Sequence, residues 1–173
     1  MEIILVPNKI LNTKTEPVKK FDSELKNLVQ GMKEILSRDN VSGAGLSAPQ
    51  VGVLKQVFIA KKFFINPTGK EESIDFAIVN PQIISQSKQT ATMFEGCLSI
   101  PNTFGKVERA RKVTIKYQDE NGELKKLKAD GFFATVIQHE YDHLQGILFT
   151  SKIIGGPLNE DELDELIKKE RNL

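Results

Sequence analysis

The chain has 173 residues, of which 39% are hydrophobic and 27% are charged, and its formal net charge is +1. This length suits one domain with a sizeable core, so we expect residues 1–173 to form a single domain. The balanced charge argues against nucleic acid or a membrane surface as the main partner, and no run of about 20 apolar residues is present to cross a bilayer. The first residues lack the features of a secretory leader, and the lone cysteine excludes an internal disulfide. We therefore expect a cytoplasmic protein.

The first predicted helix covers residues 21–38. Its apolar side chains recur at helical spacing, and Asp22 or Ser23 can cap its first turn. Residues 42–50 contain two glycines and one proline, which predict a loop. Residues 66–72 are rich in turn-forming residues and are expected to be exposed. Short strands are predicted at residues 55–60, 75–80, 83–87, 112–117 and 124–129.

A second helix is predicted at residues 131–145 and carries apolar side chains on much of its surface, so we expect it to be largely buried. The last helix is predicted at residues 159–171, where Asn159 and Glu162 form a capping-box pattern. Strands joined in hairpins, rather than alternating with helices, are typical of an α+β fold. We expect antiparallel or mixed β-sheets packed around the central helix, with one further helix near each end of the chain.

The predicted central helix contains His139-Glu-Tyr-Asp-His143, which includes both histidines of the chain. Histidines four residues apart lie on one helical face, about 5–6 Å apart at Cβ, so both imidazoles can reach one metal ion. Glu140 is rotated by about 100° around the helix and is free to act as a base on a water molecule. This HExxH pattern predicts a hydrolytic metal site. The alternative is a pair of core histidines held only by hydrogen bonds, but unpartnered polar groups in an apolar helix would be costly.

A catalytic metal site needs a third protein ligand and one open position. Downstream, Glu160, Glu162 and Glu165 lie on a charged terminal helix that we expect to be exposed. Upstream, Glu95-Gly-Cys-Leu-Ser99 contains Cys97, the only cysteine. One thiolate and two neutral imidazoles on a divalent ion leave a net charge of about +1, which acidifies a bound water. Cys97 is therefore the upstream candidate for the third ligand, beside the downstream glutamates.

Three segments together resemble the motifs of peptide deformylases. They are Gly43-Ala-Gly-Leu-Ser-Ala-Pro-Gln50, Glu95-Gly-Cys-Leu-Ser99 and Gln138-His-Glu-Tyr-Asp-His-Leu144, in the order and spacing of that family. The resemblance implies a hydrolase that removes the formyl group from the N-terminal formylmethionine of newly synthesised proteins and releases formate. Its expected partners are N-formylmethionyl nascent peptides, and the ribosome is a further candidate.

By this resemblance, Cys97, His139 and His143 bind one divalent metal ion. Fe(II) is the ion expected in the cell, and Zn(II), Ni(II) or Co(II) can take its place. Glu140 is expected to accept the proton of the attacking water and to pass a proton to the leaving nitrogen.

The resemblance assigns stabilisation of the oxyanion to the side chain of Gln50 and to the backbone N–H of Leu98. Gly45 and Gly96 are expected to pair with the main chain of the substrate peptide. The resemblance also implies a pocket for the methionine side chain, at positions that core packing would explain equally well. These positions are Ala44, Met93, Phe132, Thr135 and Val136.

The chain departs from the family pattern at Ser47, where alanine is usual, at Glu108, where proline is common, and at Thr135, which adds a hydroxyl to the expected pocket. Glu95 and Arg109 match a family pair that supports the cysteine segment, although each is also explained as a surface charge.

Two other functions fit parts of the sequence. One is a zincin-like metallopeptidase, which rests on HExxH alone, and the other is a non-catalytic module whose metal only stabilises the fold.

Overall fold

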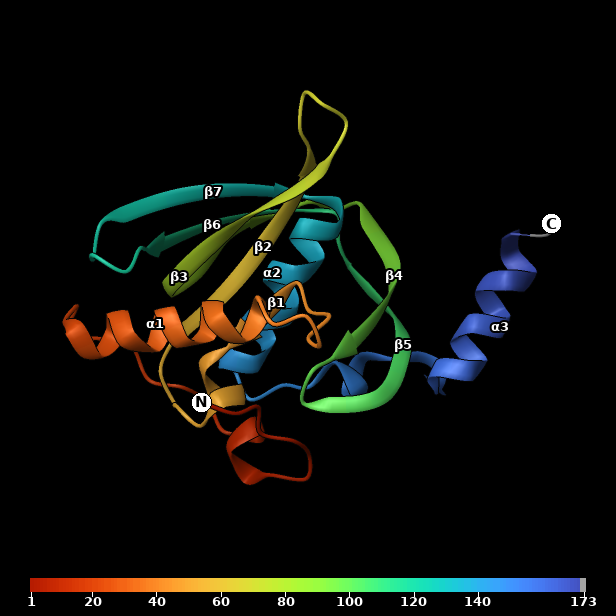
Figure 1. The fold of residues 1–173 in the computed structure, drawn as a ribbon, viewed down its shortest axis with the longest axis horizontal. Helices are drawn as coiled ribbons and strands as arrows, with labels where there is room; N and C mark the ends of the chain where they lie inside the picture. Colours follow the sequence, from red (N-terminus) through yellow and green to blue (C-terminus); the bar gives the residue numbers. More distant parts are fainter. Residues whose placement is uncertain (172–173) are drawn as a thin grey trace.

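The computed structural model describes residues 1–171, which form two antiparallel β-sheets and three α-helices (Figure 1). This arrangement confirms the predicted α+β class. The larger sheet has the strand order β1-β2-β3-β6-β7, with β1 (Gly45–Ser47), β2 (Val57–Ile65), β3 (Glu71–Gln86), β6 (Lys112–Gln118) and β7 (Leu124–Asp130). The smaller sheet has the order β4-β5-β8, with β4 (Thr90–Cys97), β5 (Ile100–Ala110) and β8 (Ile154–Leu158). Short 3-10 helices lie at η1 (Lys9–Asn12), η2 (Ala48–Val51) and η3 (Phe149–Lys152).

Helix α1 (Ser23–Leu36) lies within the range predicted from its periodicity. Asp22 caps it, because its Oδ1 accepts hydrogen bonds from the backbone N–H groups of Glu24 and Leu25 at 3.1 and 3.2 Å. Its apolar stripe packs against apolar side chains of the larger sheet. This packing supplies most of the stability of the helix. The buried side chains of this stripe are Leu25, Leu28, Val29, Met32, Ile35 and Leu36.

Helix α2 (Gly131–Leu144) is the central element, in contact with strands of both sheets (Figure 1). Eleven of its residues are buried, which confirms the prediction of a buried helix, although Phe132 near its start is half exposed. Gly146 follows its end with φ of 72°, a conformation that glycine adopts without strain. A helix buried on most sides holds its polar side chains in fixed positions, and this is the helix that carries His139 and His143.

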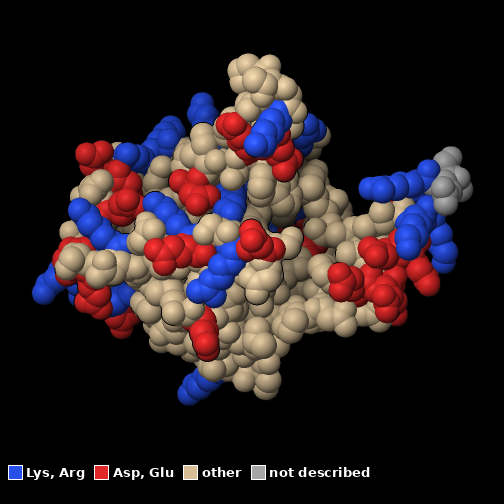
Figure 2. Space-filling view, in the orientation of Figure 1, with Lys and Arg blue, Asp and Glu red and all other residues tan. Residues whose placement is uncertain are grey.

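Helix α3 (Glu160–Arg171) extends from the body of the protein after β8 and has no buried residue (Figure 1). The predicted capping box is present, because the N–H of Glu162 donates to Asn159 Oδ1 and the N–H of Asn159 donates to Glu162 Oε2. Figure 2 shows its acidic residues next to the body and its basic residues toward the far end, while both signs of charge are dispersed over the rest of this face. Within residues 1–171, no helix combines the length and apolar character needed to cross a membrane.

Several predicted strand limits were wrong. Residues 42–50 are not a loop throughout, because β1 pairs there with β2 and is followed by η2. The two short strands predicted at 75–80 and 83–87 form one long strand, β3, with a bulge after Val79. The irregularity lies at Asn80, whose φ is 49° and whose N–H donates to the carbonyl of Gln56 in place of a partner on β6. Its side chain bonds both the N–H and the carbonyl of Val18. The loop predicted at 66–72 is shorter than expected: residues 66–70 form the exposed turn of the hairpin between β2 and β3, and Glu71 and Glu72 already pair with β2.

Candidate active site

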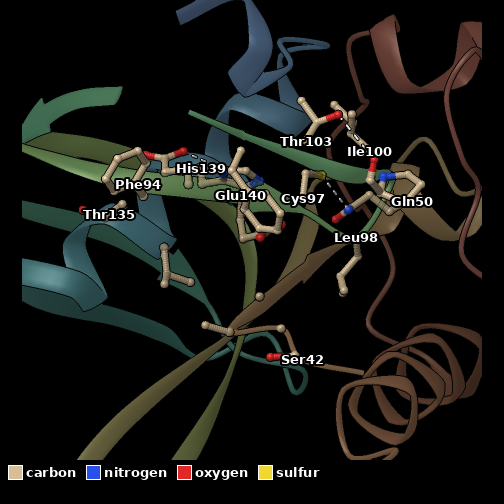
Figure 3. Close-up of a pocket in the computed structure, with 18 of the residues that line it drawn as sticks. Ser42, Gln50, Phe94, Cys97, Leu98, Ile100, Thr103, Thr135, His139 and Glu140 are labelled. Atoms are coloured by element: carbon tan, nitrogen blue, oxygen red, sulfur yellow. Dashed lines mark hydrogen bonds and ion pairs between the residues drawn. The ribbon is translucent and has the colours of Figure 1, made fainter. Parts of the chain in front are cut away.

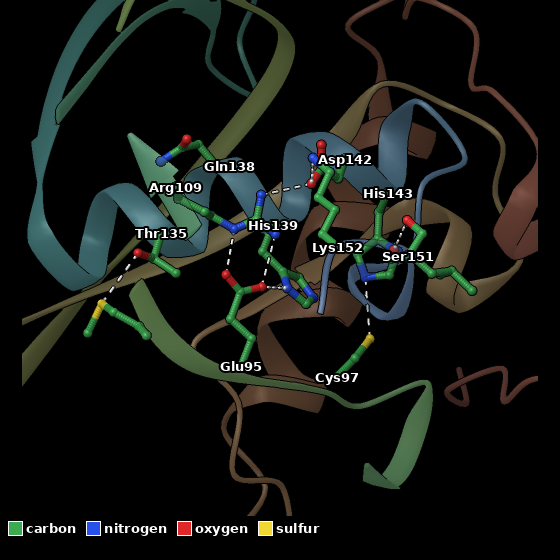
Figure 4. A network of polar contacts seen from close by, with 12 residues as sticks. Glu95, Cys97, Arg109, Thr135, Gln138, His139, Asp142, His143, Ser151 and Lys152 are labelled. Carbon is green, nitrogen blue, oxygen red and sulfur yellow. Dashed lines mark hydrogen bonds and ion pairs between the residues drawn. The ribbon is translucent and has the colours of Figure 1, made fainter. Parts of the chain in front are cut away.

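Three potential metal ligands converge where the smaller sheet meets the central helix. Cys97 lies at the end of β4, and His139 and His143 lie one turn apart on α2. Their ligand atoms all lie within 4.8 Å of one another, and Cys97 Sγ is 3.3 Å from His143 Nε2 (Figure 4). The spacing of the two histidines follows from the helical repeat, whereas the approach of Cys97 depends on the packing of β4 against α2. The sequence expectation that these three side chains meet therefore agrees with the geometry.

A buried ion pair contacts this cluster through His139. Arg109 on β5 donates to both carboxylate oxygens of Glu95 on β4, through Nε at 2.5 Å and Nη2 at 2.9 Å. Glu95 Oε2 also accepts from Nδ1 of His139 at 2.9 Å, which fixes the imidazole ring and leaves its Nε2 free for another partner (Figure 4). Burial raises the pKa of Glu95, but the hydrogen bonds from Arg109 and His139 lower it by more, to about 2. Both members of this pair are buried, so neither is a surface charge.

Asp142 and Lys152 extend this ion-pair network, and sequence reasoning missed both. Arg109 Nη1 donates to Asp142 Oδ2 at 2.8 Å, and Lys152 Nζ donates to the same oxygen at 2.6 Å. Asp142 lies within the HExxH segment on the side of α2 that faces Arg109. Its position inside the motif was the only available signal, because nothing in the sequence indicates which cations it meets. The network therefore ties β4, β5, α2 and the segment after α2 together.

The ionisable groups of the cluster have strongly shifted pKa values. Burial lowers the pKa of His139, but its contacts with Cys97 and Glu95 raise it by more, to about 10. Burial and the neighbouring His139 lower the pKa of His143 well below its usual value. Burial raises the pKa of Glu140 to about 7, although the charge of His139 opposes this shift. Groups with such opposed shifts are typical of sites that move protons or bind ions.

Gln50 is held beside Cys97 by a complete set of hydrogen bonds. Its Oε1 accepts from the N–H of Ser47 at 2.9 Å and from the Ser47 hydroxyl at 3.0 Å. Its Nε2 donates to Ser99 Oγ at 3.1 Å. The same Nε2 also donates toward Cys97 Sγ at 3.4 Å (Figure 3). Gln50 is only 1% exposed, so it is not a solvated loop residue. Ser99 was not expected from the sequence as part of this group.

A cavity of about 380 Å³ opens beside the cluster, between β1, the β4–β5 hairpin and α2 (Figure 3). Most of the side chains expected around a substrate border it, together with Cys97 and Glu140. Met93 lies outside this lining, and its sulfur is instead 3.5 Å from the hydroxyl of Thr135. Phe94 and Phe104 also border the cavity, and sequence reasoning missed both. The expected residues that border the cavity are Ala44, Gly45, Gln50, Gly96, Leu98, Phe132, Thr135 and Val136.

The donor set of the cluster fits a divalent metal ion. One soft sulfur and two imidazoles are the ligand types that suit Zn(II), Fe(II), Co(II) and Ni(II). His139 has its Nδ1 committed to Glu95, so its Nε2 is the nitrogen available for an ion. The adjacent Glu140 Oε2 is buried and has no hydrogen-bond partner among residues 1–171. An unpartnered buried carboxylate oxygen beside three converging donors is the arrangement expected where an ion or water completes the site.

Known proteins resemble this chain in sequence and in fold. The sequence model of the polypeptide deformylase family matches residues 1–156. The peptide deformylase of Campylobacter jejuni is 43% identical over 152 residues, which cover 88% of this chain and 85% of that protein. Inhibitor-bound peptide deformylase 1B of Arabidopsis thaliana has a TM-score of 0.78 and 36% identity, covering 97% of this chain and 87% of that chain. The Met-Ala-Ser-bound enzyme of Acinetobacter baumannii has a TM-score of 0.79 and 34% identity, covering 88% of this chain and 98% of that chain. This chain belongs to the peptide deformylase family of enzymes.

Proposed function

We propose that this protein hydrolyses the formamide bond of N-terminal formylmethionine on newly synthesised polypeptides and releases formate. The observation that carries the proposal is the meeting of Cys97 and Gln50 beside the histidine pair, because it combines a metal site with a fixed amide donor. Glu160, Glu162 and Glu165 lie exposed on α3, so they do not support a zincin-like ligand set. The open cavity bordered by the cluster argues against an ion with a purely structural role.

Cys97, His139 and His143 would hold the ion, which we expect to be Fe(II) in the cell, with Zn(II), Ni(II) or Co(II) as substitutes. When bound, such an ion supplies Lewis-acid chemistry, lowering the pKa of water and polarising the formyl carbonyl. Glu95 keeps the ring of His139 in position through Nδ1, so the ligand geometry does not depend on the ion alone.

Glu140 is the proposed general base and acid. Its carboxylate borders the cavity and has a pKa raised by burial to about 7, which allows it to exchange a proton near neutral pH. It would take the proton of the attacking water and then deliver a proton to the leaving nitrogen of methionine. The C–N bond breaks as that nitrogen becomes a free amino group and the formyl carbon leaves as formate.

Gln50 and Leu98 are proposed to stabilise the oxyanion. Nε2 of Gln50 points toward Cys97, and the segment containing Leu98 borders the same cavity. Preorganised N–H donors of this type each contribute about 2.7–4 kcal/mol to lowering a barrier. The side-chain amide and the backbone N–H would act together on the developing negative charge.

The cavity offers apolar walls for a methionine side chain, with Ala44, Phe132 and Val136 as the apolar members among the expected residues. We propose that Thr135 and Met93 shape this pocket, Met93 from behind Thr135. Gly45 and Gly96 would pair with the peptide main chain across the cavity. The Acinetobacter enzyme is bound to Met-Ala-Ser, a tripeptide that begins with methionine, which supports this choice of substrate.

The proposal is tested by measuring formate release from formyl-Met-Ala-Ser by protein loaded anaerobically with Fe(II). We expect activity in the wild type, loss of metal and activity in Cys97→Ser, and full retention of both in Glu162→Gln, an exposed carboxylate on α3. Retained metal in Cys97→Ser together with metal loss in Glu162→Gln would favour the metallopeptidase instead. Tight metal binding without formate release, whichever metal is loaded, would favour the non-catalytic module.

We also propose a cytoplasmic location close to the ribosome, because nascent chains are the substrate.

A further inference from the structure

We propose that Ser47 is a positioning residue for this reaction: its hydroxyl holds the side-chain amide of Gln50 in the orientation that presents Nε2 to the reacting carbonyl oxygen. This inference rests on the proposed deformylase function and adds to it a residue that departs from the alanine usual in the family motif. The Ser47 hydroxyl lies 3.0 Å from Gln50 Oε1, and both residues are almost completely buried.

The two ends of the Gln50 amide meet different partners. On one side, Oε1 accepts two hydrogen bonds from Ser47, one from its N–H and one from its hydroxyl. On the other side, Nε2 donates to Ser99 Oγ and toward Cys97 Sγ. The backbone N–H of Ser47 can only donate, so it determines which end of the amide faces Ser47. The hydroxyl fills the second lone pair of Oε1 and therefore restricts rotation of the amide plane.

Ser47 is itself part of the larger sheet. It is the last residue of β1 and is paired with Phe58 of β2, whereas Gln50 lies on the 3-10 turn that follows. The hydroxyl thus connects a catalytic side chain on a short turn to the edge of the larger sheet. Ser47 is fully buried, so water does not compete for Oε1. Donors that are already oriented before charge develops stabilise an oxyanion more than donors that must first rotate.

The simpler explanation is that the hydroxyl only satisfies its own hydrogen-bonding needs in a buried place. On that view, removing it changes the stability of the protein but leaves turnover unchanged. A positioning role predicts an effect on turnover instead: removing the hydroxyl lowers kcat, leaves KM almost unchanged and makes the Gln50 amide more mobile. The two explanations are therefore separated by kinetics and by a direct measurement on Gln50.

The kinetic test uses Ser47→Ala together with Ser47→Thr and Ser47→Val. Threonine and valine have nearly the same shape, so any steric cost at this buried position is common to both, and only threonine keeps the hydroxyl. In metal-loaded enzyme acting on formyl-Met-Ala-Ser, we expect kcat of Ser47→Ala to fall about fivefold, the worth of one ordinary hydrogen bond. We expect KM to stay within about twofold of wild type, and Ser47→Thr to exceed Ser47→Val in kcat by a similar factor.

A double-mutant cycle tests whether Ser47 acts through Gln50. In a Gln50→Ala background, Ser47→Ala should cause no further loss of kcat, because the group that the hydroxyl positions is absent. Unchanged kcat in Ser47→Ala, equal kcat in the Thr and Val variants, or a full additional loss in the Gln50→Ala background would each overturn the proposal.

The second readout does not depend on activity. In ¹⁵N-labelled, Zn(II)-loaded protein, the side-chain NH₂ signals of Gln50 are identified by their absence in Gln50→Ala. We expect these protons to exchange with solvent faster in Ser47→Ala than in the wild type. If the wild type releases no formate, the proposed function fails, and this exchange measurement alone decides whether Ser47 restrains Gln50. If the wild type is active and the exchange rates are equal, only the role of Ser47 is overturned.

Discussion

The side chain of Glu140 packs directly against the Cα of Gly45. A β-carbon at Gly45 would lie 2.7 Å from Cγ and 2.8 Å from Cδ of Glu140, distances that real side chains do not adopt. Glu140 is on the central helix and Gly45 begins β1, so this contact joins two segments far apart in the sequence. The position of the proposed general base therefore depends on a residue without a side chain on the neighbouring strand.

Gly45→Ala tests this relationship. The added methyl group must displace either Glu140 or β1, and a shift of about 1 Å in a catalytic group typically costs about 100-fold in rate. We expect kcat/KM for a formylmethionyl peptide to fall by about 100-fold while metal content is unchanged. Gly31→Ala is the matched control, because its methyl group meets only the flexible end of Met1 and lies on α1. It should keep full activity and raise the free energy of unfolding by about 0.5–1 kcal/mol. Equal activity of the two variants would contradict the assigned role of the Glu140 contact.

Arg109→Met tests the buried ion-pair network. Among residues 1–171, removing the guanidinium leaves the buried carboxylate of Glu95 with only His139 as a partner and that of Asp142 with only Lys152, and breaking a buried ion pair typically costs about 3–5 kcal/mol. Urea unfolding should show a loss of this size. Lys55→Met is the control, because Lys55 pairs with Glu16 at 3.4 Å on the exposed surface, where an ion pair contributes less than about 1 kcal/mol. A similar loss of unfolding free energy in both variants would mean that burial does not determine how much an ion pair contributes to stability.

The helices and the histidine pair were predictable because each is marked by a sequence pattern with the spacing of the helical repeat. The stripe of α1 and the HExxH spacing both follow from the helical repeat, and the lone Cys97 completed the ligand set. Strands β4, β5 and β8 were not predicted. Apolar and polar residues alternate only over Thr90–Met93 in β4, and β8 contains two glycines and a proline, so the pairing of these strands depends on contacts with one another.

The partners of the polar groups were the least predictable part of the site. Asp142 meets Arg109 and Lys152 only because α2 packs across β5 and the chain turns back after Gly146. Ser47 was recognisable as a departure from a family pattern, but its bond to Gln50 depends on the geometry of the turn after β1. Contacts of this kind result from the tertiary fold, and local sequence patterns carry no information about them.

The raised pKa of Glu140 predicts a pH dependence of stability in metal-free protein. Its pKa of about 7 exceeds the usual value of 4.5, so the folded state binds this proton more tightly than the unfolded state does. Its contribution to stability is complete below pH 4.5 and is lost as the pH rises through 7. Relative to Glu140→Gln, the wild type should therefore lose up to about 3 kcal/mol between these limits. Urea unfolding of both proteins at several pH values measures the difference, and a difference independent of pH would contradict the shift.

Metal binding should release protons from His139. Its pKa of about 10 means that the metal-free imidazole is charged at pH 8, whereas a ligand must be neutral. Calorimetric titration with Zn(II) in two buffers of different ionisation enthalpy counts the protons released. In Glu95→Gln one of the contacts that raise this pKa is removed while the contact with Cys97 remains, so we expect fewer protons to be released than in the wild type. Equal proton release in the wild type and the variant would show that Glu95 does not control the protonation of His139.

The carboxylate of Glu95 holds both Arg109 and the ring of His139. Folding of the polypeptide therefore sets the orientation of one of the proposed metal ligands, whichever ion binds. We expect a site of one sulfur and two imidazole nitrogens to accept several divalent ions in turn. The ion found in a preparation would then depend on supply and on the chemical durability of the ion, and the same chain would record the metal environment in which it was made.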